Sequence, residues 1–243
     1  MAWCMPGAAK AGLPETVAAV KPSVAAVGVY SALSSPRFGF RGTGFVVGDG
    51  RTLVTNAHVL PDNPDDPGLV LRIGSARPDA DVEPQTRKLR LLALDRAHDL
   101  ALLRIAGDPL PALELAASGS AREGQAVAFI GFPVGGLLGF SPVTHRGIIA
   151  SITPILLPPP TARQLSAAAV AQLRQGAFDI LQLDATAYPG NSGGPLFDSQ
   201  TGQVLGVINM VLVKGSRESV LSNPTGITYA IPVRFVQDLL ARQ

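Results

Sequence analysis

Short runs of β-branched and aliphatic residues recur along the whole chain, and turns rich in glycine and proline separate them. Each run is only a few residues long, which is typical of strands rather than of helices. About a dozen candidate strands can be placed in this way: Ser23–Tyr30, Gly42–Val47, Thr52–Asn56, Leu69–Ile73, Leu89–Leu94, Leu100–Arg104, Ala126–Gly131, Thr144–Ile152, Ile180–Ala185, Pro195–Phe197, Val204–Val213 and Gly226–Ile231. Because few helices separate them, the pattern favours barrels or sandwiches over an α/β fold.

Helices are predicted at three places only. The segments Pro14–Val20 and Pro232–Arg242 both begin with a proline, which is favoured at the first position of a helix. The third segment, Thr161–Gln175, is rich in alanine, starts at a threonine that can cap a helix and is followed by a glycine. The chain is therefore expected to be all-β with a helix near each end and one inside an insertion.

A change in composition at Leu115–Arg122, where alanine, serine and glycine cluster, divides the candidate strands into two sets of about six. We therefore expect an N-terminal tail at residues 1–13, a first unit over 14–117 and a second unit over 118–243. The second unit would carry an insertion at 154–176 and end in the C-terminal helix.

The composition is that of a chain with a large core, and it excludes several classes of protein. Of the 243 residues 47% are apolar, and 20 Lys and Arg against 18 Asp and Glu leave a formal charge of +2. The basic residues form no runs, so nucleic acid is not the expected partner. The longest apolar stretch, Ala126–Phe140, is broken by glycine and proline and is shorter than the roughly 20 residues of a membrane span. No membrane-spanning segment is expected.

Cys4 is the single cysteine, which excludes an intramolecular disulfide and structural metal sites of the CxxC type. It could be a plain terminal residue, a lipid anchor or a site of intermolecular pairing. The N-terminus has no charged head followed by an apolar core, so it is not recognisable as a signal peptide. The sequence implies no metal and no cofactor.

Three residues are candidates for a catalytic site. His58 lies at the end of an apolar run, and Asp99 stands just before another, where a carboxylate is costly to bury without a donor. Ser192 lies in the sequence GNSGG, where Gly190 permits a backbone turn that points amide groups at a substrate oxygen. Taken singly, each has a plain alternative: a loop or core histidine, a surface aspartate and a serine in a tight turn.

Taken together, the three residues follow the order His58, Asp99, Ser192, which is the order of the chymotrypsin-type triad. The first two fall in the first half of the chain and the serine in the second, as catalysis between two barrels would require. The combination predicts a serine nucleophile with a histidine base.

The chain resembles the protease domain of the HtrA (Deg) family of trypsin-like serine proteases. The resemblance rests on motifs spread in the family's order over nearly the whole chain: GTGFVV at Gly42–Val47, VTNAHV at Val54–Val59, HDLALLR at His98–Arg104, GFPVG at Gly131–Gly135, GIIASI at Gly147–Ile152, LQLDATAYPGNSGGPLF at Leu181–Phe197, GVIN at Gly206–Asn209 and ITYAIP at Ile227–Pro232. It implies two six-stranded antiparallel β-barrels of the chymotrypsin type, with a C-terminal helix.

The resemblance also implies the role of each site residue. His58 would be the general base, Asp99 its support and Ser192 the nucleophile, with the first two on the first barrel and the serine on the second. The oxyanion hole would be formed by Gly190, Asn191 and Ser192, through the amides of Gly190 and Ser192.

The resemblance places a substrate pocket around Thr186, which stands where trypsin-like enzymes that cleave after basic residues carry an acid. The pocket wall would include Val207, Ile208, Asn209 and Met210. We therefore expect a serine endopeptidase that cleaves unfolded or damaged polypeptides after small or medium apolar residues.

Two departures from the family pattern stand out. The sequence ends soon after Pro232 and contains no PDZ domain of the kind that most HtrA proteins carry, so it is either a protease-only member or a shortened chain. The insertion at 154–176 lies where the family has a regulatory loop, and it could be a gate, a contact between subunits or a surface elaboration without consequence. Family habit further suggests a homotrimer, with Trp3, Phe38 and Phe40 as contacts unless they pack in the core, and a periplasmic or other extracytoplasmic location.

Two rival functions remain open. The first is a latent or inactive relative that binds polypeptides as a chaperone or scaffold. The second is an esterase with the same triad, although an α/β-hydrolase would present its residues in the order Ser, Asp, His, which this chain does not.

Overall fold

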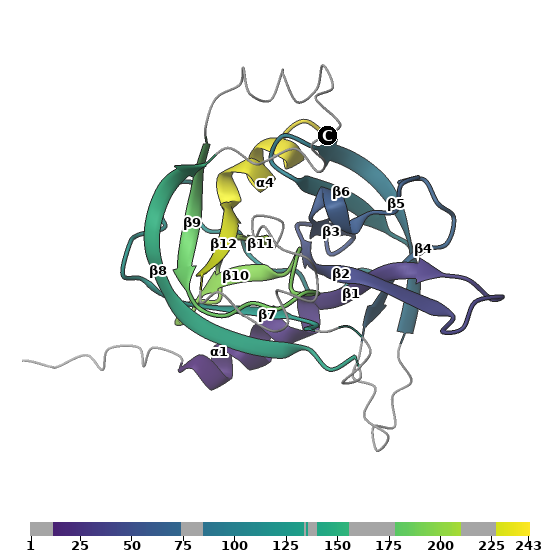
Figure 1. Cartoon of the computed structure of the whole chain (residues 1–243), viewed down its shortest axis with the longest axis horizontal. Helices are drawn as coiled ribbons and strands as arrows, with labels where there is room; N and C mark the ends of the chain where they lie inside the picture. The colour runs from purple at the N-terminus through teal and green to yellow at the C-terminus, as the bar shows by residue number, and fades with distance from the viewer. Residues whose placement is uncertain (1–11, 74–84, 134, 136–139, 156–177, 210–226) are drawn as a thin grey trace, which may run out of the picture.

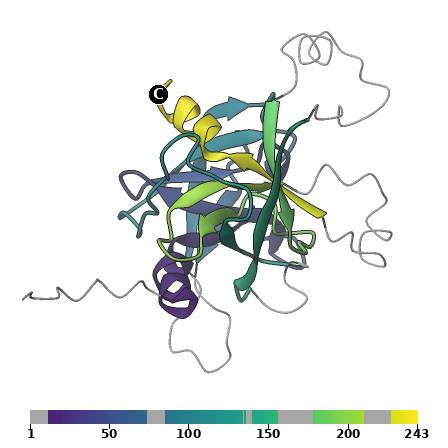
Figure 2. The same ribbon diagram turned by 90° about the vertical axis from the view of Figure 1, so that its left-hand side faces the viewer.

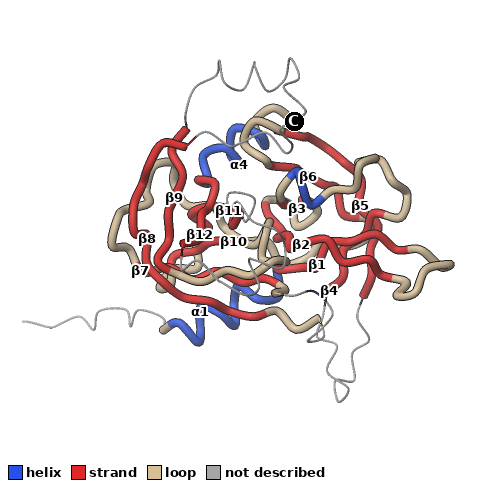
Figure 3. The backbone as a smooth tube through the Cα atoms, in the orientation of Figure 1, coloured by secondary structure: helices blue, strands red, loops and turns tan. Residues whose placement is uncertain are grey.

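The computed structural model describes residues 12–73, 85–133, 135, 140–155, 178–209 and 227–243 (Figure 1). Its strands close into two antiparallel barrels of six strands each. The predicted fold class is therefore confirmed. Figure 3 shows that strands dominate the described chain and that helix is confined to a few short segments.

The first barrel has the strand order β1-β2-β3-β6-β5-β4. Every neighbouring pair is antiparallel, and β1 closes the barrel by pairing with both β2 and β4. Its core is a cluster of aliphatic side chains, among which Val27, Leu53 and Leu103 are completely buried. The strands are β1 (Val24–Tyr30), β2 (Phe38–Val47), β3 (Thr52–Thr55), β4 (Leu69–Ile73), β5 (Gln85–Asp95) and β6 (Leu100–Ile105).

The second barrel has the order β10-β11-β12-β9-β8-β7 and closes by pairing β7 with β10. Its core includes the completely buried side chains of Phe129, Leu196 and Ile208. The strands are β7 (Ala126–Gly131), β8 (Val143–Ile155), β9 (Phe178–Asp184), β10 (Pro195–Asp198), β11 (Val204–Asn209) and β12 (Ile227–Pro232).

A third apolar cluster joins the two barrels. It combines residues of the first barrel such as Phe45 with residues of the second such as Ile130 and Phe197. The connection between the barrels is held by both of them, because Leu113 bridges to Val47 and Leu115 to Val204. The two barrels that carry the candidate site residues therefore share an apolar contact.

Two of the three predicted helices are present, as α1 (Leu13–Val20) and α4 (Val233–Leu240). They lie at opposite ends of the molecule in Figure 1 and in the rotated view of Figure 2. The third, Thr161–Gln175, lies outside the described residues. Two 3-10 turns complete the described elements, η1 (Lys21–Ser23) and η2 (Ala57–Val59). None of the helices in the described ranges is long and apolar enough to cross a membrane.

Phe38 and Phe40, expected to contact another subunit or pack in the core, form part of an intramolecular aromatic cluster. The ring of Phe38 lies edge-on to Phe140 at 5.2 Å, and Phe40 lies 6.4 Å from Phe132. Both side chains are partly buried by these contacts. Trp3 lies outside the described residues, and a homotrimer stays a prediction.

Candidate active site

His58 is placed by the short turn η2 that follows strand β3. The turn forms because the backbone oxygen of Asp99 accepts hydrogen bonds from the Ala57 N–H at 3.1 Å and from the Asn56 side chain at 2.9 Å. The turn thereby ties the end of β3 to the start of β6. The imidazole remains one-third exposed, so one of its faces is open to a substrate.

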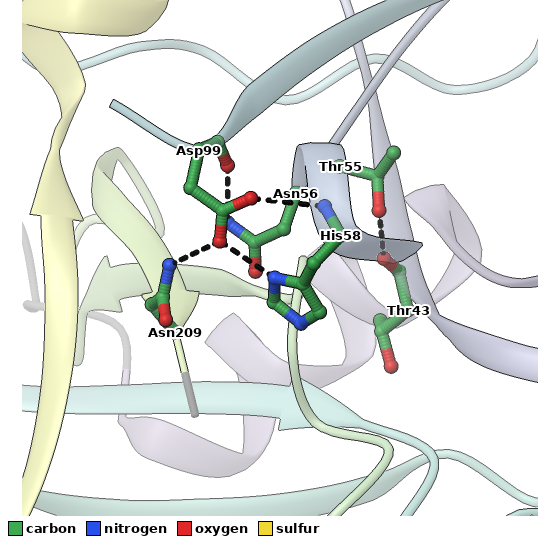
Figure 4. Close-up of polar contacts among 6 residues, drawn as sticks. All are labelled: Thr43, Thr55, Asn56, His58, Asp99 and Asn209. Atoms are coloured by element: carbon green, nitrogen blue, oxygen red, sulfur yellow. Dashed lines mark hydrogen bonds and ion pairs between the residues drawn. The ribbon is translucent and has the colours of Figure 1, made fainter. Parts of the chain in front are cut away.

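Asp99 holds the histidine with both carboxylate oxygens (Figure 4). Oδ1 accepts the backbone N–H of His58 at 2.9 Å, and Oδ2 lies 2.6 Å from Nδ1 of the His58 ring. The Asp99 backbone has a φ of 53°, a conformation in which aspartate is enriched over most residues. Because Nδ1 donates to the carboxylate, the lone pair of a neutral ring is on Nε2, where a base needs it.

Asn209 adds a third hydrogen bond to this carboxylate. It is the last residue of β11, and its side-chain Nδ2 donates to Asp99 Oδ2 at 2.7 Å. Asn209 is 1% exposed and Asp99 is nearly buried, so the bond lies away from bulk water. Sequence reasoning missed this contact because it joins residues of different barrels; an amide at the end of an apolar strand was the only signal.

Ser192 is buried to 5% exposure in the loop between β9 and β10, and this loop is held by the first barrel. The Thr43 N–H donates to the Ser192 carbonyl at 2.8 Å, and the Thr43 hydroxyl donates to the Gly190 carbonyl at 2.7 Å. The same hydroxyl accepts the Phe132 N–H at 3.1 Å. One threonine of β2 thus fixes the backbone on both sides of Asn191.

Gly190 has a φ of 104°, in the region that glycine adopts without strain. A side chain there would also press on the Phe132 carbonyl oxygen and lie 3.0 Å from the Phe40 ring. Within the described chain, the N–H groups of Gly190 and Ser192 form no hydrogen bond. Both amides are thus available to an oxygen from outside the protein.

The Ser192 hydroxyl and His58 are not hydrogen-bonded to each other, and the hydroxyl has no other partner among the residues that the structure describes. The structure brings His58 and Asp99 into direct contact and places Ser192 in a separate, glycine-rich loop. Catalytic hydrogen bonds often tighten only when the substrate binds, so the open contact is compatible with activity.

Asn191 is completely buried between the two free amides. Its backbone N–H donates to the Tyr188 carbonyl at 3.0 Å, and its carbonyl accepts the Gly194 N–H at 3.0 Å. Its side-chain Nδ2 lies 3.4 Å from Nε2 of His145, and its Oδ1 has no partner in the described structure. Burial lowers the pKa of His145, so the neutral imidazole is favoured.

The residues expected in the substrate pocket occupy different settings. Thr186 is partly buried, whereas Val207 and Ile208 are completely buried in two different apolar clusters. Asn209 contacts Asp99 as described, and Met210 lies outside the described residues. The assignment of these residues to a pocket stays a prediction.

A second histidine–aspartate pair lies beside α4. His98 Nδ1 is 2.8 Å from Asp95 Oδ2, and the His98 ring stacks on Phe235 of α4 at 3.9 Å. Burial alone would raise the pKa of Asp95, but the hydrogen bonds and the charge of His98 outweigh it and bring that pKa below its ordinary value. The pair joins the turn before Asp99 to the C-terminal helix, and no nucleophile among the described residues bonds to it.

The described ranges contain no cluster of side chains suited to a metal ion. No group of three or more His, Cys, Asp or Glu side chains gathers there.

Known proteins of similar sequence are named as serine proteases. A probable periplasmic serine endoprotease, DegP-like, of Pseudomonas fluorescens is 28% identical over 82% of this chain and 34% of its own length. The mitochondrial serine protease HTRA2 of Drosophila willistoni is 31% identical over 83% of this chain and 38% of its own length. The chain thus spans little more than a third of these relatives.

Solved structures of similar fold carry related names. A serine endoprotease from Yersinia pestis has a TM-score of 0.64 and 23% identity, covering 96% of this chain and 66% of that one. The HtrA-type protease AlgW with a decapeptide has a TM-score of 0.66 and 22% identity, covering 95% and 67%. At this identity the two structures support the fold alone.

The model of the trypsin-like peptidase domain matches residues 42–207, a range that includes His58, Asp99 and Ser192. The predicted resemblance to HtrA proteases is confirmed by the relatives. The chain therefore belongs to the family of trypsin-like peptidase domains.

Proposed function

We propose that this chain is a serine endopeptidase that hydrolyses peptide bonds through an acyl-enzyme intermediate. The observation that carries the proposal is the contact of 2.6 Å between His58 Nδ1 and Asp99 Oδ2, in a chain whose serine loop also offers the unpaired N–H groups of Gly190 and Ser192. Family membership supports the same activity. Before the reaction can start, the Ser192 hydroxyl has to form a hydrogen bond to His58, and a substrate carbonyl has to bind.

In the proposed mechanism the Ser192 Oγ attacks the carbonyl carbon of the scissile bond while His58 Nε2 takes its proton. Asp99 keeps the ring in the tautomer with the proton on Nδ1 and stabilises the imidazolium that forms. His58 then returns the proton to the leaving amine, which leaves Ser192 esterified. A water molecule, deprotonated by the same histidine, hydrolyses the ester and restores the serine.

The N–H groups of Gly190 and Ser192 would bind the oxyanion of both tetrahedral intermediates. Both amides already lack internal partners, so binding the oxyanion breaks no existing hydrogen bond. Loss of one such donor lowers turnover by roughly 10² to 10³ in enzymes of this kind. Asn191 would contribute by holding the loop between them.

For the substrate, we propose unfolded or damaged polypeptides cleaved after small or medium apolar residues. Thr186 offers no charge to a lysine or arginine side chain, and Val207 and Ile208, which were expected in the pocket wall, are apolar. The names of the relatives point to the periplasm or, in the insect proteins, to mitochondria. We propose an extracytoplasmic location on this analogy, and a homotrimer from the resemblance to the HtrA family alone.

A latent enzyme is the second candidate, and it is favoured by one observation. Among the described residues Ser192 has no hydrogen bond to His58, although the transfer of its proton requires one. In a latent form, substrate or another signal would first have to move the loop between Gly190 and Ser192. The chain would meanwhile bind polypeptide without cutting it.

Labelling with a fluorophosphonate probe, followed by peptide mapping, tests the proposal. We expect the label on Ser192 in the wild-type chain and none on Ser192→Ala, while Ser23→Ala, a matched change at another buried serine, keeps it. Denatured casein should be cut by the labelled forms only. No label with and without casein would contradict the enzyme proposal, and a label that needs casein would identify the latent form.

A peptide series that differs only at the residue before the scissile bond tests the specificity. We expect kcat/KM to be highest for alanine, valine and leucine and at least tenfold lower for lysine, the size of effect that an unpaired buried charge produces. Equal rates for leucine and lysine would contradict the apolar pocket while leaving the enzyme proposal intact.

A further inference from the structure

His145 lies beside the serine loop without belonging to the Ser192, His58 and Asp99 set. It stands on β8 opposite Phe129 of β7, and the two rings stack at 4.7 Å with an angle of 15°. The ring centroid also lies 6.0 Å from that of Tyr188, with the two rings tilted by 43°. The imidazole is thus enclosed between a buried strand and the segment that leads to Ser192.

The His145 ring also contacts the side chain of Asn191, in the serine loop. Nε2 of His145 lies 3.4 Å from Nδ2 of Asn191. An amide nitrogen only donates, so the ring nitrogen must accept, which requires a neutral imidazole with its proton on Nδ1. In the described structure this is the only side-chain hydrogen bond of Asn191, because its Oδ1 has no partner.

Asn191 is the residue between the two free amides. Its side chain is completely buried, so it cannot exchange its contact with His145 for one with bulk water. A reorientation of this side chain would act on the backbone of Gly190 and Ser192 directly, since both are its neighbours in the chain. His145 therefore contacts the side chain of the residue that joins the two amides.

We propose that His145 is a positioning residue for the oxyanion hole, so that the activity depends on the protonation state of His145 as well as on that of His58. This inference rests on the proposed peptidase function. When neutral, His145 holds the Asn191 amide; when protonated, it presents an N–H to the Asn191 N–H, and the side-chain amide has to rotate. Acidification would then disturb the loop by a route separate from protonation of His58.

The surroundings of His145 contain few other charges. Tyr188 is the titratable group that faces it, and Phe129 on the neighbouring strand carries none. Arg146 is exposed and follows on the same strand, so it points to the opposite face. Burial is the cause that lowers the pKa of His145, and no ion pair among the described residues counters it.

The pH profile of kcat/KM on a peptide substrate tests the proposal. In the wild type we expect an acid limb with a slope of about 2, because two groups must be deprotonated, and in His145→Gln a slope of about 1. Glutamine can still accept the Asn191 N–H but does not titrate. His98→Gln, a change at the other partly buried histidine, should keep the steep limb.

A second variant separates positioning from folding. His145→Phe keeps a ring against Phe129 but removes the acceptor, so kcat should fall roughly three- to tenfold, the worth of one hydrogen bond, with KM unchanged. Unfolding curves show whether the variant is folded. A wild-type slope in His145→Gln, or an unchanged kcat in folded His145→Phe, would overturn the proposal.

NMR on the Ser192→Ala chain gives a readout that does not need turnover. The side-chain amide signals of Asn191 should shift with the same midpoint as the ring signals of His145, and this coupling should vanish in His145→Gln. If Asn191 does not respond to the His145 titration, the proposal fails even when the enzyme is active. If the coupling is present but the wild-type chain cuts no peptide, the proposed peptidase function is wrong and the positioning role of His145 is not.

Discussion

Thr43 and Ser192 belong to different barrels, and the N–H of the first donates to the carbonyl of the second at 2.8 Å. The hydroxyl of the same threonine donates to the carbonyl of Gly190. The loop that carries the proposed nucleophile is therefore held by a strand of the opposite barrel.

Replacing Thr43 with valine removes this hydroxyl while keeping the shape of the side chain. The Gly190 carbonyl and the Phe132 N–H then lose a partner, so we expect the free energy of unfolding to fall by about 1–3 kcal/mol. Labelling of Ser192 should also slow down. Thr55→Val is the matched control, because the Thr55 hydroxyl donates to the Thr43 carbonyl but not to the serine loop. If both variants slow labelling equally, the link to the loop is wrong.

Replacing Asn209 with alanine removes one of three hydrogen bonds to the Asp99 carboxylate. His58 keeps its direct contact, so we expect kcat to fall about tenfold, equivalent to about 1.4 kcal/mol, with little change in KM. Asn209→Asp should be worse than alanine, because it places a second carboxylate beside the first. Steady-state kinetics of the two variants decide the matter, and an aspartate variant faster than the alanine variant would contradict the assigned contact.

Replacing Gly190 with alanine should abolish turnover in a chain that still folds. The backbone there has a φ of 104°, and the added methyl group would meet the Phe132 carbonyl oxygen. Gly48→Ala is the control: its φ is 62°, and an added Cβ meets nothing within 4 Å, so it should cost only about 1 kcal/mol of stability and leave turnover alone. Kinetics and circular dichroism of both variants test this, and a Gly190→Ala enzyme with wild-type kcat would disprove the role of the loop.

The Asp95–His98 pair should make stability depend on pH. The pKa of Asp95 is lowered in the folded chain, so its contribution is complete above the ordinary value of 3.8 and is lost as the pH falls toward the lowered pKa. Asp95→Asn should lower the free energy of unfolding by about 1–2 kcal/mol at neutral pH, as expected for hydrogen bonds to a charged group. Urea titrations should show the difference shrinking below pH 3.8. A difference that does not change with pH would contradict this contribution.

Much of this structure could be predicted from local pattern. The strand centres and the helices at Pro14–Val20 and Pro232–Arg242 follow from short apolar runs, prolines and glycines, which act on their own neighbourhoods. The pattern left barrels and sandwiches open, and the two barrels were expected from the family resemblance. The ends of strands could not be placed as well. The strand β5 begins at Gln85 rather than at Leu89, because backbone pairing continues where side chains are polar, as between Val70 and Lys88.

The contacts of the candidate site also fall into two groups, those that the sequence predicts and those that depend on how distant strands are arranged. Order along the chain and a family resemblance placed His58 near Asp99, and the two are in contact. Asn209 at Asp99 and His145 at Asn191 could not be predicted, because each contact joins residues of distant strands and depends on how those strands are arranged. An amide or an imidazole at a strand position carries no local signal of its partner.

Hydrogen bonds run between the two barrels in both directions: Thr43 of the first holds the loop of Ser192, and Asn209 of the second holds Asp99. Ser192 and Asp99 are therefore each held in part by the barrel that does not carry them. A slight separation of the barrels would release both groups at once, while each barrel kept its own core. In such a chain, hydrolysis would stop at a smaller structural change than the one that unfolds the protein.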